Sequence, residues 1–166
     1  MKKTQRRYVA RTDRSPPSES STYQCHKTIR KAAIKMLARR EYSALEIQDK
    51  LSEYYHLETI DDVILELQRQ DWQSDERFAE MWVRSRANRG YGPQRIQHEL
   101  KQKGVVVSLI VDALSAYEKN EQTWCDLAQA VYLKKYGAMP SGSWKEDVKR
   151  HKFMQYKGFS HTQFTS

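Results

Sequence analysis

One short motif occurs three times along this chain, and it constrains the fold more than any other feature. Each copy has a cation, a turn-forming residue, an aromatic residue and a small residue suited to capping the start of a helix. An apolar residue follows four positions after each copy. Repetition of a turn and helix start at this spacing predicts a tandem array of helical units. The copies of this turn motif are Arg40-Glu41-Tyr42-Ser43, Arg89-Gly90-Tyr91-Gly92 and Lys157-Gly158-Phe159-Ser160.

The composition supports stacked units with thin cores. Of 166 residues, 39% are apolar and 30% are charged, which suits a helical array better than one deep core. No apolar run approaches the roughly 18 residues of a membrane helix, and the basic N-terminus lacks the apolar stretch of a secretory signal. Cys25 and Cys125 are far apart and are expected to be ordinary reduced thiols. We therefore expect a cytoplasmic protein.

Charge is distributed unevenly along the chain. Residues 1–31 hold nine Lys or Arg and two acidic residues, whereas residues 32–80 hold six and twelve. Residues 81–120 then hold seven basic and three acidic residues, and residues 121–166 hold seven and four. An acidic block between basic segments indicates a charged partner, or two partners of opposite sign, rather than a uniform coat for nucleic acid.

Apolar residues recur at spacings of three and four, which predicts helices throughout. We expect an all-α fold, an elongated tandem array of three three-helix repeats that resemble helix-turn-helix units. The predicted divisions are a flexible basic arm at 1–24, an acidic repeat 1 at 25–72, a basic repeat 2 at 73–120 and repeat 3 at 121–166, shortened at its C-terminus. Ser43 with Glu46 and Ser143 with Glu146 have the spacing of capping boxes at helix starts.

No pattern in the sequence indicates catalysis. The five histidines are scattered, and no second Cys or His pair gives metal-ligand spacing beside Cys25-His26. Arg89-Gly90-Tyr91-Gly92-Pro93 ends one helix and starts another, and no strand precedes it as in a phosphate-binding loop. We expect no enzyme activity, no metal and no cofactor.

Six cations of repeat 2 form the candidate binding site. They fall within twenty residues that contain one acid, Glu99, whereas an ordinary solvated face usually mixes charges more evenly. Their clustering favours a surface for an anionic partner, with a merely solvated face as the alternative. The motif aromatics Tyr42, Tyr91 and Phe159 are interpreted as corners packed between helices, with stacking on nucleic acid as the alternative. The six candidates are Arg84, Arg86, Arg89, Arg95, Lys101 and Lys103.

Two adjoining stretches carry a resemblance to a known family. DERFAEMWVRSR at 75–86 and RGYGPQRIQHELKQKGV at 89–105 resemble the central repeat of the RecX family. A weaker resemblance covers 33–51, and Lys135-Tyr136-Gly137 with 153–160 is similar to the family's final repeat. The linker before the central repeat, Gln70-Asp71-Trp72-Gln73-Ser74, departs from the family's more usual Gly-aromatic-Leu-Asp run.

The resemblance implies an elongated all-α regulator of the RecA recombinase without cofactor or metal. Such proteins lodge in the groove of the RecA–single-stranded DNA filament and restrain its ATP hydrolysis, strand exchange and co-protease activity, which affects DNA repair, recombination and the SOS response. We therefore expect a cytoplasmic, monomeric inhibitor of the RecA filament. The alternative is a stand-alone nucleic-acid-binding protein with tandem helix-turn-helix units that takes single- or double-stranded DNA, against which the acidic repeat 1 argues.

Overall fold

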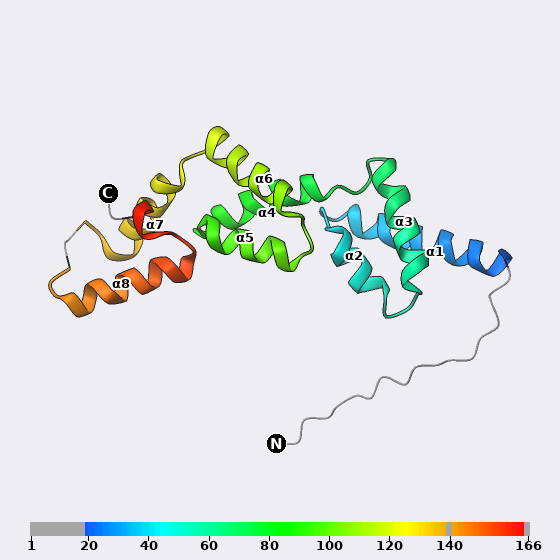
Figure 1. Ribbon diagram of the computed structural model, residues 1–166, viewed down its shortest axis with the longest axis horizontal. Helices are drawn as coiled ribbons and strands as arrows, with labels where there is room; N and C mark the ends of the chain where they lie inside the picture. The colour runs from blue at the N-terminus through cyan, green and yellow to red at the C-terminus, as the bar shows by residue number, and fades with distance from the viewer. Residues whose placement is uncertain (1–18, 139–140, 165–166) are drawn as a thin grey trace, which may run out of the picture.

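The computed structural model describes residues 19–138 and 141–164, and the predicted all-α fold is confirmed for them. Figure 1 shows an elongated row, with α1–α3 at one end, α4–α6 in the middle, and α7 and α8 at the other end. The predicted arm at 1–24 lies largely outside the described residues, and α1 begins within that range. The helices are α1 (Glu19–Leu37), α2 (Ala44–Leu51), α3 (Leu57–Arg69), α4 (Asp75–Ala87), α5 (Pro93–Gln102), α6 (Val107–Asn120), α7 (Trp124–Tyr136), α8 (Trp144–Lys157) and the 3₁₀ helix η1 (His161–Gln163).

Repeat 1, formed by α1–α3, has a hydrophobic core of its own. Ile29 of α1, Ile47 of α2 and Ile60 of α3 are fully buried in it. The first turn motif starts α2, because the Ser43 hydroxyl accepts the N–H of Glu46 at 3.1 Å and satisfies a free amide at the helix start. Repeat 1 is therefore a separate small bundle at one end of the row.

Repeats 2 and 3 share a second core. Phe78 of α4 and Ile110 of α6 lie in the same buried cluster as Met154 of α8 and Phe159 of the third turn motif. At the junction of α6 and α7, Tyr117 stacks on Trp124 with ring centroids 4.7 Å apart. Repeat 3 thus packs on repeat 2 as one body rather than forming a third core among the described residues.

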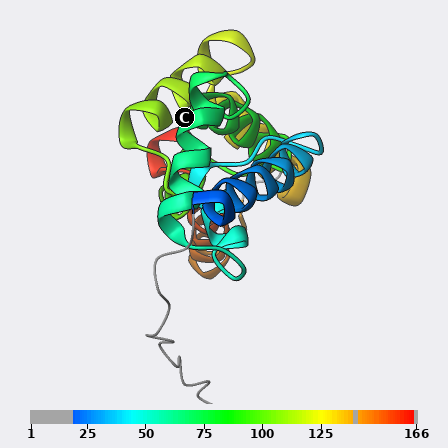
Figure 2. The same ribbon diagram turned by 90° about the vertical axis from the view of Figure 1, so that its right-hand side faces the viewer.

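Repeat 3 has two full helices and one turn of 3₁₀ helix. The third turn motif follows α8 and starts η1, where Ser160 and Gln163 form a reciprocal capping box. In repeats 1 and 2 the same motif joins the first helix to the second, whereas here it joins the second helix to η1. Seen from the end occupied by repeat 1 (Figure 2), the other helices lie behind it along one axis.

The first turn motif is also the joint between repeats 1 and 2. The backbone N–H of Ala44 donates to Asp75 Oδ1 of α4 at 2.9 Å. Gln73, which is 1% exposed, donates to the Tyr42 carbonyl at 3.1 Å and to the same Asp75 oxygen at 2.8 Å. The amide at the start of α2 is therefore satisfied by a side chain of the next repeat.

The second and third turn motifs meet face to face at the joint between repeats 2 and 3. The N–H of Gly92 donates to the Lys157 carbonyl at 2.8 Å, and the N–H of Gln94 donates to the Gly158 carbonyl at 3.1 Å. Carbonyls at the end of α8 thus satisfy free amides at the start of α5. Gly158 has φ +93°, and a Cβ at Gly92 would lie 2.5 Å from its carbonyl oxygen, so both glycines are needed for the close approach.

No helix in the described part of the chain is both long and apolar enough to cross a membrane.

Candidate anion-binding surface

The six predicted cations do not form one exposed face. Arg84, Arg89 and Lys101 are exposed, whereas Arg86, Arg95 and Lys103 are partly buried and engaged with acidic side chains. The expectation that Arg86 is exposed alongside Arg84 and Arg89 is wrong, since its side chain is only 23% exposed. Helical geometry explains the split, because Arg84, Arg86 and Arg89 project from different sides of the end of α4.

Arg86 and Arg95 converge on one carboxylate, Glu99 of α5. Arg86 Nε lies 2.7 Å from Glu99 Oε2 as an ion pair, and Arg95 Nε donates to Oε1 at 3.2 Å. The indole N–H of Trp82 donates to the same Oε2 at 3.2 Å, and the Arg86 guanidinium lies 4.4 Å from the Trp82 ring centroid. These cations neutralise Glu99 and hold α4 against α5, so they are poorly placed to meet a partner.

Lys103 ties repeat 2 to repeat 1. Its Nζ donates to Glu46 of α2 and lies 4.4 Å from the Trp82 ring centroid on the side of repeat 2. Arg40 also pairs with Glu46, at 3.0 Å. Burial favours the neutral carboxyl, but the hydrogen bonds from Lys103 and Arg40 outweigh it and lower the pKa of Glu46 below its usual value of 4.5.

The exposed cations differ in their surroundings. Arg84 Nε pairs with Glu121 at 3.0 Å, with side chains 63% and 43% exposed, and an ion pair so accessible to water contributes little to stability. Arg89 and Lys101 have no acidic side chain in ion-pair range among the described residues. Arg89 lies at the rim of a groove between repeats 2 and 3.

That groove lies between the end of α4, α7 and α8, and has a volume of about 610 Å³. Its walls include the apolar side chains of Leu127, Val131 and Phe153 together with the amides of Asn88 and Gln122. Four cations complete the lining, and no acidic residue of the described chain takes part in it. The cations are Arg89, Lys134, Lys135 and Lys157.

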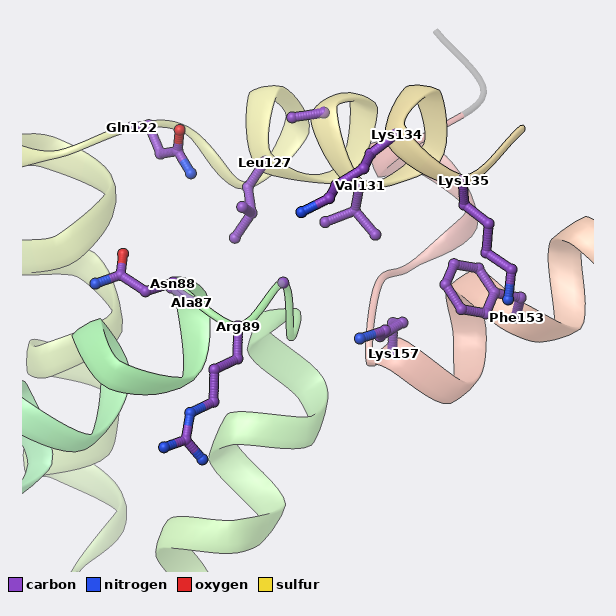
Figure 3. A pocket seen from close by; sticks show the side chains of 12 residues that line it. Ala87, Asn88, Arg89, Gln122, Leu127, Val131, Lys134, Lys135, Phe153 and Lys157 are labelled. Carbon is purple, nitrogen blue, oxygen red and sulfur yellow. The ribbon is translucent and has the colours of Figure 1, made fainter. Parts of the chain in front are cut away.

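Figure 3 shows how the lysines lie around this groove. Lys134 extends from α7 and Lys157 from α8 toward the space between the helices, while Lys135 reaches across to Phe153. Lys135 Nζ lies 3.6 Å from the Phe153 ring centroid, and Lys157 Nζ lies 4.4 Å from that of Tyr91. The Arg89 guanidinium points away from α7 at the rim. Aromatic faces, rather than carboxylates, therefore hold two of these cations.

The ends of three helices explain why cations gather here. Arg89 follows the C-cap of α4, Lys134 and Lys135 lie in the last turn of α7, and Lys157 is the last residue of α8. The C-terminus of a helix carries partial negative charge, which stabilises cations beside it. The groove is thus a concave, positively charged surface suited to phosphate or carboxylate groups.

Sequence reasoning identified Arg89 but missed Lys134, Lys135, Lys157 and Phe153 as site residues. One signal was present, because Arg89 and Lys157 occupy the same first position in two copies of the turn motif. The described residues contain no group of three His, Cys, Asp or Glu side chains that could hold a metal ion. The chemistry that these groove residues offer is the binding of anions.

Comparison with known proteins identifies relatives of this architecture. Residues 74–114 match the family model described as RecX, second three-helix domain. A regulatory protein RecX from Legionella pneumophila (strain Corby) is 37% identical over 129 residues, which cover 77% of this chain and 84% of that protein. Another from Pectobacterium atrosepticum is 31% identical over 151 residues, covering 81% and 91%.

Solved structures show the same fold. A crystal structure of regulatory protein RecX superposes with a TM-score of 0.72 at 26% sequence identity, covering 86% of this chain and 70% of that one. The crystal structure of RecX from Lactobacillus salivarius gives a TM-score of 0.69 at 25% identity, covering 85% and 92%. The tandem helical array is therefore shared with these proteins.

Proposed function

The chain belongs to the RecX family of regulatory proteins, and on that premise we propose that it binds the RecA–single-stranded DNA filament and inhibits its ATPase, recombinase and co-protease activities. It acts as a monomer in the cytoplasm, without cofactor, and so modulates DNA repair and recombination. One observation supports a filament as the target: the array is elongated, with acidic side chains exposed at the end formed by repeat 1 and cations around the groove at the other end.

Opposite charges at the two ends suit a composite target. Repeat 1 exposes acidic side chains at Asp49, Glu53, Glu58, Asp61 and Asp62, while the charged residues that line the groove at the other end are all cations. A filament of protein on DNA presents both basic protein surface and phosphates. Repeat 1 would then face basic protein surface, and repeats 2 and 3 would face DNA or acidic protein surface. Charge complementarity of this kind orients the encounter and accelerates it.

Inhibition follows from the shape of the array. A row of repeats in the filament groove would contact several recombinase subunits at once and compete with the contacts needed for ATP turnover or subunit addition. The exposed cations Arg84, Arg89 and Lys101 are the contact residues that we propose from the predicted set. Arg86, Arg95 and Lys103 support the surface by holding α4, α5 and repeat 1 together.

The groove also favours a second candidate, a protein that binds nucleic acid without RecA. The two functions differ in one requirement, since the regulator acts through the recombinase and the nucleic-acid-binding protein does not. Salt sensitivity does not separate them, because both interfaces are ionic.

The test is single-stranded-DNA-dependent ATP hydrolysis by the cognate RecA, with this protein below equimolar amounts. We expect strong inhibition at ratios too low to coat the DNA. Replacing Arg84, Arg89 and Lys101 together by alanine should raise the concentration for half-inhibition by about 5- to 140-fold, since three partly exposed charge contacts contribute roughly 1–3 kcal/mol in total.

A matched variant removes equal charge elsewhere. Lys50, Arg69 and Lys145 are exposed cations outside the proposed contact set, and their triple alanine variant should inhibit like the unchanged protein. Circular dichroism should show unchanged helicity for both. Equal potency of the two variants would refute the contact assignment. Hydrolysis unaffected by the unchanged protein, together with tight DNA binding, would assign the second function.

A further inference from the structure

We propose that the groove between α4, α7 and α8 is a site for single-stranded nucleic acid, in which one base stacks on Phe153 and the flanking phosphates meet the lysines. This inference rests on the proposed function in that it names the DNA strand as what this end of the array contacts. The binding itself requires no recombinase, which allows the two to be tested separately.

Charge is the first argument. Arg89, Lys134, Lys135 and Lys157 come from three different helix ends and surround one hollow. None of these four cations has an ion-pair partner among the described residues. Most other cations near the core are neutralised, as Arg86 and Arg95 are by Glu99. A set of unneutralised cations around a concavity follows the path of a phosphate backbone.

Phe153 is the second argument. Its ring lines the groove, and Tyr136 supports it edge to face, with centroids 5.7 Å apart. Lys135 Nζ, at 3.6 Å from the ring centroid, covers the ring without forming an ion pair. A base has a π-face that can replace this ammonium group on the ring, and the released lysine can then reach a phosphate. Lys135 thus exchanges its contact with the ring for a contact with a phosphate, and the stacking of the base on Phe153 adds to the affinity.

The other walls suit a nucleotide as well. Leu127 and Val131 present an apolar surface for a sugar or base face, and the amides of Asn88 and Gln122 can donate to and accept from base edges. Stacking and phosphate contacts, which are available to all four bases, would supply most of the affinity. We therefore expect binding that depends weakly on sequence.

Three possible anionic ligands can be compared with this lining. A duplex keeps its base faces stacked inside, so it cannot place a base on Phe153. An acidic peptide would use the cations but offers no group that stacks on the Phe153 ring. A single strand offers phosphates and unstacked bases together, which uses every part of the groove.

The first arm of the test uses the unchanged full-length protein alone with a fluorescein-labelled oligodeoxynucleotide of about 12 nucleotides, within the usual range of site sizes. A strand of equal length with abasic positions keeps its phosphates and removes the stacking. We expect the abasic strand to bind about 5- to 140-fold more weakly, and a duplex of the same length to compete poorly. Equal affinity for base-bearing and abasic strands would overturn the stacking on Phe153.

The second arm uses matched variants on α8. Phe153→Leu keeps an apolar side chain but removes the ring. This variant should bind the base-bearing strand only as tightly as the unchanged protein binds the abasic strand. Trp144→Leu removes an aromatic residue that is 77% exposed on the same helix outside the groove, and it should leave binding unchanged. Melting temperatures identify any unfolding of Phe153→Leu, in which case the abasic comparison alone decides. Equal strand binding by both folded variants would contradict the proposal.

The third arm tests the cations and the peptide alternative. Replacing Lys134 and Lys157 by alanine should reduce the slope of log affinity against log salt by about 0.7 for each cation removed. Polyglutamate that displaces the strand at equal charge concentration would instead assign the groove to an acidic protein segment. Strand binding as predicted, without inhibition of RecA, would refute the proposed function and leave the groove assignment intact. Inhibition of RecA without the predicted strand binding would refute the groove assignment and leave the proposed function intact.

Discussion

Gly92→Ala tests the joint between the second and third turn motifs. The backbone of Gly92, with φ −85° and ψ 170°, is accessible to any residue, so alanine meets no torsional strain there. Its Cβ, however, would lie 2.5 Å from the Gly158 carbonyl oxygen and 2.7 Å from Phe159 Cδ1. The substitution therefore perturbs the close approach of the two repeats and nothing else in the local conformation.

The magnitude follows from two ways of relieving this clash. Either the packed joint stays closed under strain, at about 1–3 kcal/mol, or it opens and loses two backbone hydrogen bonds at about 0.5–1.5 kcal/mol each. Replacing glycine by alanine also reduces the conformational entropy of the unfolded chain, which raises the free energy of unfolding by about 0.4–1 kcal/mol. We expect a net loss of about 1–2 kcal/mol in the free energy of unfolding.

The assay is thermal unfolding, with amide hydrogen exchange at residues 92 and 94. For a chain of this length the loss corresponds to a melting temperature lower by about 2–8 °C, and both amides should lose protection. Gly142→Ala is the matched control, because no atom lies within 4 Å of the added Cβ and its φ is not in the left-handed range. If the two variants melt at the same temperature, the face-to-face joint is wrong.

Two further predictions concern the joint between repeats 1 and 2. Gln73→Ala should cost about 1–3 kcal/mol in urea unfolding, because the partly buried Tyr42 carbonyl loses its side-chain donor and Asp75 keeps only the Ala44 N–H, whereas exposed Gln102→Ala should stay within about 0.5 kcal/mol. Because its folded pKa is lowered, Glu46 stabilises the protein fully above its unfolded value of 4.5, and this contribution disappears as the pH falls through the folded pKa. The urea midpoint of the unchanged protein should therefore fall below pH 5, and it should fall less steeply in Glu46→Gln. If the midpoints of the two proteins fall in parallel with pH, the ion pairs of Glu46 are not the cause.

Helix starts show how far local sequence reasoning reaches. The sequence predicts caps at Ser43 and Ser143, and in both cases the hydroxyl accepts the N–H three residues later. The full capping box predicted at Ser43 is only half realised, because the Glu46 carboxylate binds Lys103 and Arg40 instead of the cap. A charged partner from the next repeat outcompetes a local backbone amide for this carboxylate.

The motif aromatics were interpreted as packed corners, and their burial agrees with this. Phe159 is fully buried, while Tyr42 and Tyr91 are partly buried against the two cores. The sequence did not indicate that two of the motifs pack against each other, because that contact joins residues more than sixty positions apart. The sequence predicts Gly90 as a turn residue and Gly92 as a helix start, whereas in the structure Gly92 also makes the close contact with Gly158.

The sequence by itself determined the helices, their caps and the repeated turns, because these depend on interactions within a few residues of each other. It also determined the charge of each segment and the family. Only the tertiary structure decided which cations lack an acidic partner, since Arg86 and Arg89 are three residues apart, yet Arg86 pairs with Glu99 and Arg89 lies at the rim of a groove. The groove itself forms where three helix ends meet, and Coulomb and packing interactions between such distant residues depend on distances in space that sequence spacing does not fix.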